Sequence, residues 1–338
     1  LAQYKRELSL NGLTTLSDEA ATALAQHEGS LYLKGLTTFS DEAATALAQH
    51  KGYLSLNGLT ALSAEAATAL AQHKGVLFLN GLTTLSDEAA KAFAQHKGSY
   101  LSLNGLTTLS AEAAKSLAQG KGWLSLNGLT ALSAEAAAAL AQHKGALFLN
   151  GLTTLSDEAA TALAQYKGGL SLPGLTTLSE EAAKGLAQHE GYLSLNGLTT
   201  LSAEAAKALA QHKGDYLYLN GLTTLSAEAA TALAQHEGEL YLDGLTTLSA
   251  EAVAALAQLK GKSLRLSDRA TKSFFQNNRV TPKTALFWAA LSDGELTDVT
   301  AFDSPDSVAI AKALATRKGP LSLPNLKKIS PKTLSALL

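Results

Sequence analysis

One segment of about 23 residues recurs along this chain and constrains its fold more than any other feature. Residues 54–76 show it most clearly, as LSLNGLTALSAEAATALAQHKGV, and close copies run from Leu8 to about Gly261. Periods of about 20 to 50 residues are typical of solenoids, propellers and arrays. A single repeat of this size cannot bury its own leucines, whereas a stack of repeats buries them in one continuous core.

The first half of each repeat predicts a short strand followed by a turn. Leu54 and Leu56 point to one side of an extended chain, and Ser55 between them points to the other. Asn57-Gly58 then indicates a turn, because glycine adopts positive φ without steric cost and asparagine tolerates it.

The second half predicts a helix of two to three turns. Ser63 suits the N-cap, and Glu65 lies in the first turn, where the helix dipole favours an anion. Several alanines allow the helix to lie close to the strands. We expect Lys74 and Gly75 to close the helix as a last-turn cation and a C-terminal glycine.

The spacing of the first strand leucine predicts twelve successive strands. These leucines are residues 8, 31, 54, 77, 101, 124, 147, 170, 193, 217, 240 and 264. Most steps are 23 residues, and three are 24 because of one extra residue (Ser99, Asp215 or Lys262) after the glycine that follows the helix. Insertions there are expected to fall in loops, which tolerate them.

The repeat LxLxGLxxLSxEAAxALAQHKG resembles the leucine-rich repeat family, and is most similar to the 23-residue bacterial types of cell-surface proteins. The resemblance implies an α/β fold, a right-handed solenoid with parallel strands on one face and short helices on the other. It also implies a non-catalytic protein outside the cell or on its surface that binds proteins or surface polymers. The common family pattern has asparagine where this chain has Leu13, Leu36, Leu59 and Leu82, so the buried asparagine ladder is in doubt here.

Composition excludes several classes of function. The chain has 338 residues and no cysteine, which excludes a disulfide framework and thiolate chemistry. No run of 18 apolar residues occurs, so no transmembrane helix is expected. Neither a Ser/His/acid set nor a phosphate loop occurs outside the repeats, so we expect no catalytic residue, cofactor or metal. Because methionine is absent, the chain as given is not expected to begin at a translation start.

Two domains are expected, a regular array at 1–261 and degenerate repeats at 262–338. In the second, Thr281-Pro282 reopens a helix, Leu296, Val299 and Phe302 indicate a further repeat, and Leu321, Leu323 and Leu326 indicate a last one. Atypical terminal repeats usually cap a solenoid, which is the favoured interpretation. The alternative is a docking module anchored by Phe274, Phe275 and Trp288.

Both ends of the chain match the middle of the repeat's helix. Leu1-Ala2-Gln3 matches Leu24-Ala25-Gln26, and Leu337 of the last helix again matches Leu24. Residues 262–338 hold 12 basic and 6 acidic residues, which leaves 27 − 12 = 15 basic and 29 − 6 = 23 acidic residues in 1–261. The chain is therefore either a segment of a longer repeat protein or a unit that stacks head-to-tail. Stacking would use Leu1, Leu8, Leu10, Leu334, Leu337 and Leu338.

Stacking also aligns equal repeat positions into columns. The eight histidines form one (His27, His50, His73, His96, His143, His189, His212, His236), and Leu259 occupies it elsewhere. A metal stripe is conceivable, but packed histidines that complement the helix dipole are favoured. The glutamate column (Glu19, Glu42, Glu65 and onward) suits first-turn helix anions better than calcium. The glutamine column (Gln26, Gln49, Gln72 and onward) predicts an amide ladder.

The outward strand positions that flank the first leucine carry an aromatic residue in nearly every repeat. These are Tyr32, Tyr53, Phe78, Tyr100, Trp123, Phe148, Tyr192, Tyr216, Tyr218 and Tyr241, with a gap at Gly169 and Ser171. Strands about 4.8 Å apart would align the rings into a stripe about 50 Å long. The rings either stabilise the sheet or form a binding surface, and binding is favoured because nothing is expected to cover that face.

The leading hypothesis is therefore a non-catalytic binding solenoid of the cell surface or exterior, whose rings bind a protein or polysaccharide. A self-assembling filament subunit is the alternative, and an enzyme ranks third. Nucleic acid is not an expected partner, because no basic run or aromatic-basic module occurs.

Overall fold

The computed structural model describes residues 6–266, 285, 288–289, 291, 301–302, 306–317, 321–324 and 326–338. The chain divides into two compact units, residues 1–174 and 175–338. The boundary predicted at residue 261 stays a prediction. None of the described helices is both long and apolar enough to span a bilayer.

Short strands begin nearly every repeat. All twelve predicted first leucines lie in strands, which confirms the repeat spacing. The strands are β1 (Leu8–Ser9), β2 (Leu31–Tyr32), β3 (Leu54–Ser55), β4 (Val76–Phe78), β5 (Tyr100–Ser102), β6 (Trp123–Ser125), β7 (Leu147–Phe148), β8 (Leu170–Ser171), β9 (Leu193–Ser194), β10 (Tyr216–Tyr218), β11 (Glu239–Leu242) and β12 (Ser263–Leu266).

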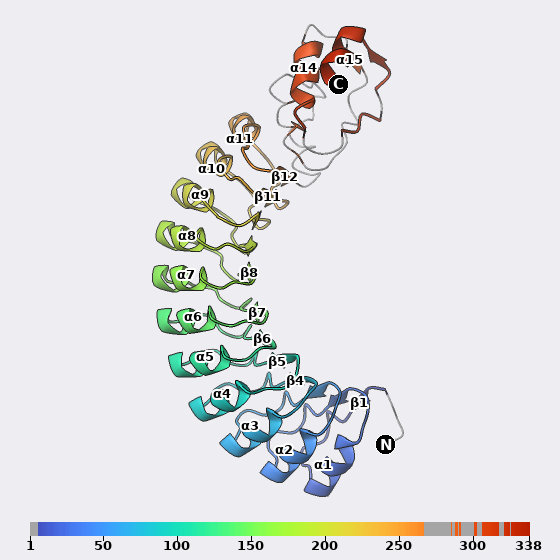
Figure 1. The fold of residues 1–338 in the computed structure, drawn as a ribbon, viewed down its shortest axis with the longest axis vertical. Helices are drawn as coiled ribbons and strands as arrows, with labels where there is room; N and C mark the ends of the chain where they lie inside the picture. The colour runs from blue at the N-terminus through green and yellow to red at the C-terminus, as the bar shows by residue number, and fades with distance from the viewer. Residues whose placement is uncertain are drawn as a thin grey trace. The chain divides into compact units, whose positions relative to one another are not determined.

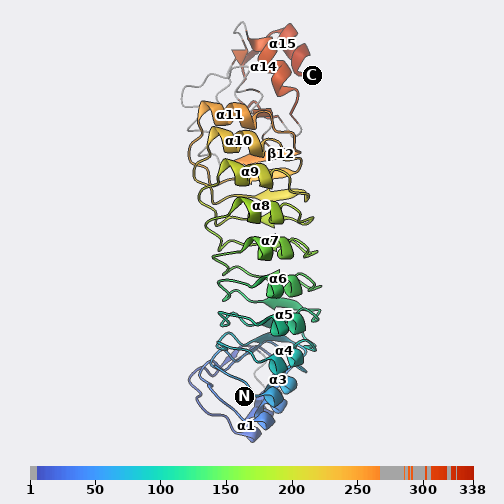
Figure 2. The same ribbon diagram turned by 90° about the vertical axis from the view of Figure 1, so that its left-hand side faces the viewer.

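A short helix follows each of the first eleven strands. These are α1 (Asp18–Ala25), α2 (Asp41–Leu47), α3 (Ala64–Leu70), α4 (Asp87–Phe93), α5 (Ala111–Leu117), α6 (Ala134–Leu140), α7 (Asp157–Leu163), α8 (Glu180–Leu186), α9 (Ala203–Leu209), α10 (Ala227–Leu233) and α11 (Ala250–Leu256). Within the first unit α1 to α7 each pack on the next, and within the second α8 to α11 do the same (Figures 1 and 2).

The strands pair in parallel and in register, with leucine beside leucine. One sheet has seven strands in the order β1 to β7, and another has five in the order β8 to β12. In the first unit the strands lie on one side of the repeats and the helices on the other (Figure 1). The first leucines pair in series, as in Leu101 with Leu124 and Leu124 with Leu147. These leucines, the second strand leucines and the helix alanines form the buried core.

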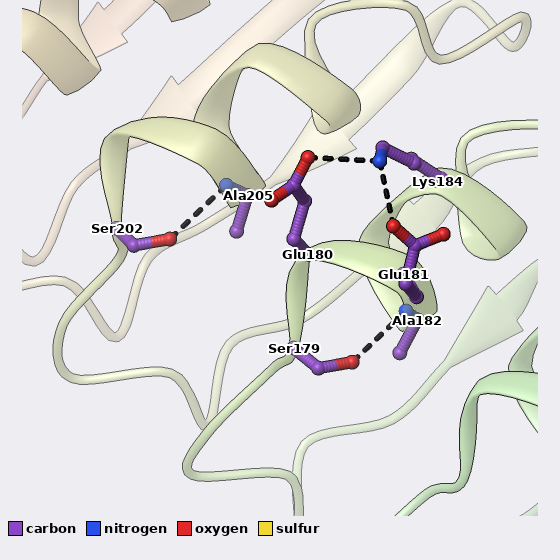
Figure 3. A network of polar contacts seen from close by, with 7 residues as sticks. All are labelled: Ser179, Glu180, Glu181, Ala182, Lys184, Ser202 and Ala205. Atoms are coloured by element: carbon purple, nitrogen blue, oxygen red, sulfur yellow. Dashed lines mark hydrogen bonds and ion pairs between the residues drawn. The ribbon is translucent and has the colours of Figure 1, made fainter.

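Serine caps fix where each helix starts. In α3 the Ser63 side chain accepts a hydrogen bond from the Ala66 N–H, and the same contact begins every helix from α1 to α11. Figure 3 shows two of these caps, with Lys184 bridging Glu180 and Glu181 at 2.8 and 2.7 Å. The predicted N-cap and first-turn anion are thus confirmed.

The predicted helix end is wrong. Helix α3 ends at Leu70 with Ala71 as its C-cap, and no basic residue lies in its last turn. Lys74 and Gly75 therefore follow the helix and belong to the segment that leads to the next strand. Three alanines, Ala66, Ala67 and Ala71, are buried as predicted.

Glycine is required for close backbone approach. Gly58 and Gly75 do not have positive φ, so the reason first given for the turn is wrong. A Cβ atom at Gly58 would lie 2.1 Å from the carbonyl oxygen of Lys34 in the preceding repeat. At Gly75 it would lie 1.9 Å from the carbonyl oxygen of Gly52. Any side chain at these columns would push successive repeats apart.

An asparagine ladder joins the repeats, but two residues before the position of the common family pattern. The Oδ1 atom of Asn57 accepts the N–H of Asn80 at 2.9 Å, and Asn80 accepts that of Asn104 at 2.9 Å. The same bond recurs from Asn11, Asn104, Asn127, Asn196 and Asn220 to the following repeat. The doubt about a ladder, which rested on Leu59, is therefore corrected.

The ladder and the sheet are interrupted at the same place. Pro173 stands in the asparagine column after Asn150, and proline has no N–H to donate. Strand pairing is also interrupted here, since β7 ends one sheet and β8 begins the other.

The described residues of 262–338 keep part of the repeat pattern. Leu264 forms a parallel bridge with Leu291, so a strand position follows β12 that the sequence did not reveal. Ala285, Trp288 and Ala289 are helical, in agreement with the helix predicted after Pro282. Strands β13 (Ala301–Phe302) and β14 (Lys328–Ile329) pair in parallel, and α14 (Ser307–Leu314) packs on α15 (Pro331–Leu337). Leu296 and Val299 lie outside the described residues.

Candidate binding face

The predicted aromatic residues of the first unit form one continuous set of ring contacts, the first ring cluster. Its members are Tyr32, Tyr53, Phe78, Tyr100, Trp123 and Phe148. Adjacent ring centroids are 5.2, 4.5, 5.4 and 6.4 Å apart from Tyr32 to Trp123. Phe148 lies 6.0 Å from Trp123 and 6.3 Å from Tyr100. Register places them together, since Tyr100 of β5 pairs directly with Trp123 of β6.

The aromatic residues of the second unit form the second ring cluster, which contains Tyr192, Tyr216, Tyr218 and Tyr241. Tyr218 is at its centre, 4.3 Å from Tyr241, 6.2 Å from Tyr192 and 6.4 Å from Tyr216. The Arg265 guanidinium lies 5.9 Å from the Tyr241 ring centroid, within the distance for a cation–π contact. A single 50 Å stripe through both clusters stays a prediction.

Most rings are half-buried because they lie against one another. Only Trp123, Tyr192 and Tyr216 are exposed, at 57, 46 and 40%. The exposed apolar area on this face is therefore smaller than the sequence predicted and is concentrated at these three rings.

The rings also cover serines that the sequence left exposed. Ser55, Ser102, Ser125 and Ser194 are all buried. Ser102 pairs in register with Phe78, and Ser125 pairs with Phe148, so each serine lies beside a ring. A small side chain at these positions leaves space for the neighbouring ring to lie on the sheet. Stabilisation of the sheet by the rings is thus part of the face.

The buried serines are bound to the asparagine ladder. The hydroxyl of Ser102 donates to Asn80 Oδ1 at 2.6 Å, and that of Ser125 donates to Asn104 Oδ1 at 2.7 Å. Ser125 also accepts from Asn127 Nδ2 at 3.0 Å. Sequence reasoning missed this network, although serine opposite an aromatic residue and one repeat after an asparagine was a signal for it.

The tyrosine hydroxyls of the face stay neutral near pH 7. Burial raises the pKa of Tyr53, and the neighbouring Tyr32 and Tyr100 raise it further. Burial also raises the pKa of Tyr241, together with a 2.9 Å hydrogen bond from its hydroxyl to Glu239 Oε2. The face therefore offers ring surfaces and neutral hydroxyls and no group activated for proton transfer.

The histidine column is packed, as the favoured interpretation predicted. Seven of the eight histidines are buried and His96 is half-buried. Nε2 of His143 lies 2.9 Å from Gly122 O, and Nε2 of His73 lies 3.1 Å from Gly52 O, both in the preceding repeat. Burial lowers the pKa of His96 and His212 to about 4. These rings are neutral at pH 7, so the predicted complement to the helix dipole is wrong.

The other columns are solvent-exposed. The glutamine side chains from Gln26 onward are exposed and form no ladder, so that prediction is wrong. Glutamates of the acidic column, such as Glu19 and Glu65, lie in first helical turns as predicted. Within the described ranges, no three histidine or acidic side chains gather as they do around a metal ion.

The residues predicted for head-to-tail stacking differ in exposure. Leu8 in β1 is buried, and Leu10 and Leu337 are half-buried. Leu334 is 43% exposed and Leu338 is 96% exposed. Leu1 lies outside the described residues, as do Phe274 and Phe275 of the suggested docking module. Trp288 is buried, and its carbonyl oxygen accepts from Arg317 Nη1 at 2.6 Å, so its ring is not an exposed anchor.

No protein-family model matches the chain, and no curated protein sequence matches it. Several solved structures are similar. A leucine-rich repeat protein of Leptospira interrogans is 20% identical over 98% of this chain and 86% of its own, with a TM-score of 0.45. An internalin of Listeria monocytogenes is 18% identical over 79% and 82%, with a TM-score of 0.45.

A chain of the Drosophila Toll–Spätzle complex is 15% identical over 96% of this chain, with a TM-score of 0.50. This chain spans 40% of that longer one. Identities this low inform on the fold alone. With the alternating parallel strands and short helices described above, they identify the fold as an α/β leucine-rich repeat solenoid.

Proposed function

We propose that this protein is a non-catalytic binding scaffold that holds a protein or polysaccharide partner on its ring clusters. The exposure of Trp123, Tyr192 and Tyr216 carries the proposal. Aromatic rings offer large contact areas at small entropic cost, and their hydroxyl or indole N–H groups supply directional bonds. In both clusters, stacking against half-buried neighbours holds the exposed rings before a partner arrives.

The cell surface or exterior is the location we propose, on the similarity of the repeat to the 23-residue bacterial surface type. A scaffold role also accords with the chemistry of the face. Its hydroxyls are neutral, and its nearest charged groups, Glu239 and Arg265, contact Tyr241 directly. A surface of this kind binds a partner's flat apolar area and leaves its covalent bonds unchanged.

Replacing the three exposed rings tests this proposal. The Trp123→Ser/Tyr192→Ser/Tyr216→Ser variant should lose at least about 100-fold in affinity, since anchors of this type each contribute about 2 kcal/mol or more. The partner is sought with a panel of neutral polysaccharides and surface proteins. Binding is followed by the emission of Trp123 in a Trp288→Phe background, in which Trp123 is the only tryptophan.

The matched control is Tyr32→Ser/Phe78→Ser, which removes two half-buried rings of the same face. It should lower the melting temperature more than the exposed-ring variant does, because these rings pack on neighbours within the sheet. If binding survives the exposed-ring variant while the fold is intact, the ring clusters are not the site.

Head-to-tail assembly is the second function we propose, and the exposure of Leu334 and Leu338 favours it. Exposed leucines on α15 suit burial against another copy, whose strand β1 has a free edge. Sedimentation of the chain at micromolar concentration should show a concentration-dependent series of oligomers. The Leu334→Glu/Leu338→Glu variant should sediment as a monomer. A monomer for the parent chain at low and high salt alike would contradict this second function.

A further inference from the structure

Six lysines occupy the same repeat position in six successive repeats of the first unit. This lysine row consists of Lys51, Lys74, Lys97, Lys121, Lys144 and Lys167, and every member is exposed. Each lysine lies between the end of a helix and the start of the next strand, so the row follows one edge of the stacked repeats. Among described residues, the side chains of the first five form no ion pair.

A groove of about 460 Å³ opens in the middle of this row, beside the C-terminal ends of α5 and α6. It is lined by Lys115, Lys121 and Lys144, by Gln119 and Gln142, and by Ala118 and Ala139. The groove thus combines three cationic groups with two amides that donate hydrogen bonds. No acidic, arginine or aromatic side chain lines it.

Helix stability does not explain the row. Helix α5 ends at Leu117 and α6 ends at Leu140, so Lys121 and Lys144 each follow by four residues. Dipole effects fall off within the last turn. The same repeat position holds glutamate at residues 28, 190 and 237, after helices of similar length and capping.

The second unit shows what a self-neutralised version of this edge looks like. There the position alternates between glutamate and lysine, through Glu190, Lys213, Glu237 and Lys260. The groove on that edge is lined by lysines 213, 260 and 262 but also by Asp215 and Glu237. Lys262 is ion-paired with Asp215. The first unit has no such internal partner in its groove, so its lysines are available to an external anion.

The charges favour an anion despite the nearby helix ends. Each helix C-terminus carries about −0.5 of an elementary charge, so two contribute about −1. Three lysines contribute +3, which leaves a net charge of about +2 at the groove. Glutamine amides on both sides can hold the oxygens of a carboxylate or sulfate.

We propose that the lysine row and its groove bind a linear acidic polysaccharide, whose carboxylate or sulfate groups contact successive lysines. The repeated spacing of the row suits a polymer, because a small anion would use the groove alone. Nucleic acid fits less well, since single-stranded sites combine basic grooves with stacking rings and with arginine. This inference does not depend on the ring clusters, because the groove contains none of their residues.

Fluorescence anisotropy with labelled dextran sulfate, alginate, neutral dextran and oligothymidylate tests the proposal on the full chain. At 50 mM salt, dextran sulfate or alginate should bind at least about tenfold more tightly than neutral dextran and oligothymidylate, and the two probes separate sulfate from carboxylate as the ligand group. The Lys115→Gln/Lys121→Gln/Lys144→Gln variant should lose at least about tenfold in affinity. Its logarithmic salt dependence should become shallower by about 2 to 3, because fewer counterions are released.

The matched control, Lys34→Gln/Lys91→Gln/Lys207→Gln, removes the same charge from exposed lysines outside the row and should change affinity by less than about twofold. Circular dichroism verifies that both variants are folded. Equal losses in the two variants would reduce the effect to net charge and overturn the proposal. So would the absence of acidic-polysaccharide binding, and so would tighter binding of oligothymidylate. Ring-cluster ligands should bind the groove variant normally, so this test and that of the binding face fail independently.

Discussion

Acidification from pH 7 to pH 4 should lower the free energy of unfolding by several kcal/mol, because the buried histidines bind protons only when the chain unfolds. Burial lowers the pKa of six of them, His50, His73, His96, His143, His212 and His236. Neighbouring imidazoles add to the effect, as at His212, whose ring lies 5.8 Å from that of His236.

The direction follows from the two states. Between the ordinary pKa of 6.5 and the folded pKa of about 4, the unfolded chain holds more protons than the folded one. Stability is therefore complete above pH 6.5 and is lost as the pH falls toward 4. For a ring such as His96 the loss amounts to roughly 3 kcal/mol once the pH is below the folded pKa. The carboxylates act at lower pH, since hydrogen bonds of the cap lower the pKa of Glu135 and Glu251.

The chain supplies its own control for this prediction. Tyr166 occupies the histidine column, is buried, and donates to the carbonyl oxygen of Gly145 at 2.6 Å. The His96→Tyr/His212→Tyr variant should therefore keep the packing and lose part of the titration. Urea unfolding monitored by circular dichroism from pH 7.5 to 4 should give it a shallower pH dependence than the parent. Identical pH curves for parent and variant would show that the histidines do not cause the acid loss.

The sequence predicted the features set by local chemistry and period. Twelve strand positions, the serine caps and the packed histidine column follow from one repeat, because each depends on residues a few positions apart. The repeat also predicted which ten aromatic residues share the strand face. Stacking equal positions into columns was enough to place them.

Contacts between repeats could not be predicted in the same way. The ladder role of Asn57 depends on the N–H of Asn80, 23 residues later, while its neighbour Gly58 made the pair look like a turn. The helix end was misplaced because Lys74 and Gly75 fit a C-terminal pattern, whereas Gly75 is needed for close approach to Gly52. Ring exposure was overestimated since alternation shows which face a side chain takes and does not show how neighbouring rings lie.

Removing one ladder asparagine should cost more where it also holds a buried serine. Asn104 Oδ1 accepts both the N–H of Asn127 at 2.8 Å and the hydroxyl of Ser125 at 2.7 Å. Ser125 is fully buried, so the Asn104→Ala variant leaves two donors without that acceptor. Each stranded buried donor costs about 1–3 kcal/mol, so we expect a loss of about 2–4 kcal/mol in the free energy of unfolding.

Asn57→Ala is the matched comparison, because the next repeat has Phe78 where Ser125 stands, and the Asn57 Oδ1 atom accepts the Asn80 N–H without a serine. Its cost should be about 1–2 kcal/mol, the lower part of the same scale. The difference between the two variants isolates the hydroxyl of Ser125. Adding Ser125→Ala to Asn104→Ala should then recover part of the loss, since no buried hydroxyl is left without its acceptor.

Hydrogen exchange measures these effects at single repeats, which matters because a repeat array need not unfold in one step. In Asn104→Ala the Asn127 amide should exchange faster, while the Asn80 amide keeps its parent rate. In Asn57→Ala the pattern should reverse. Equal unfolding costs for the two variants would mean that the hydroxyl of Ser125 finds a substitute partner, such as its remaining contact with Asn127 Nδ2. The serines under the rings would then serve only to leave space for them, and the ladder alone would join the repeats.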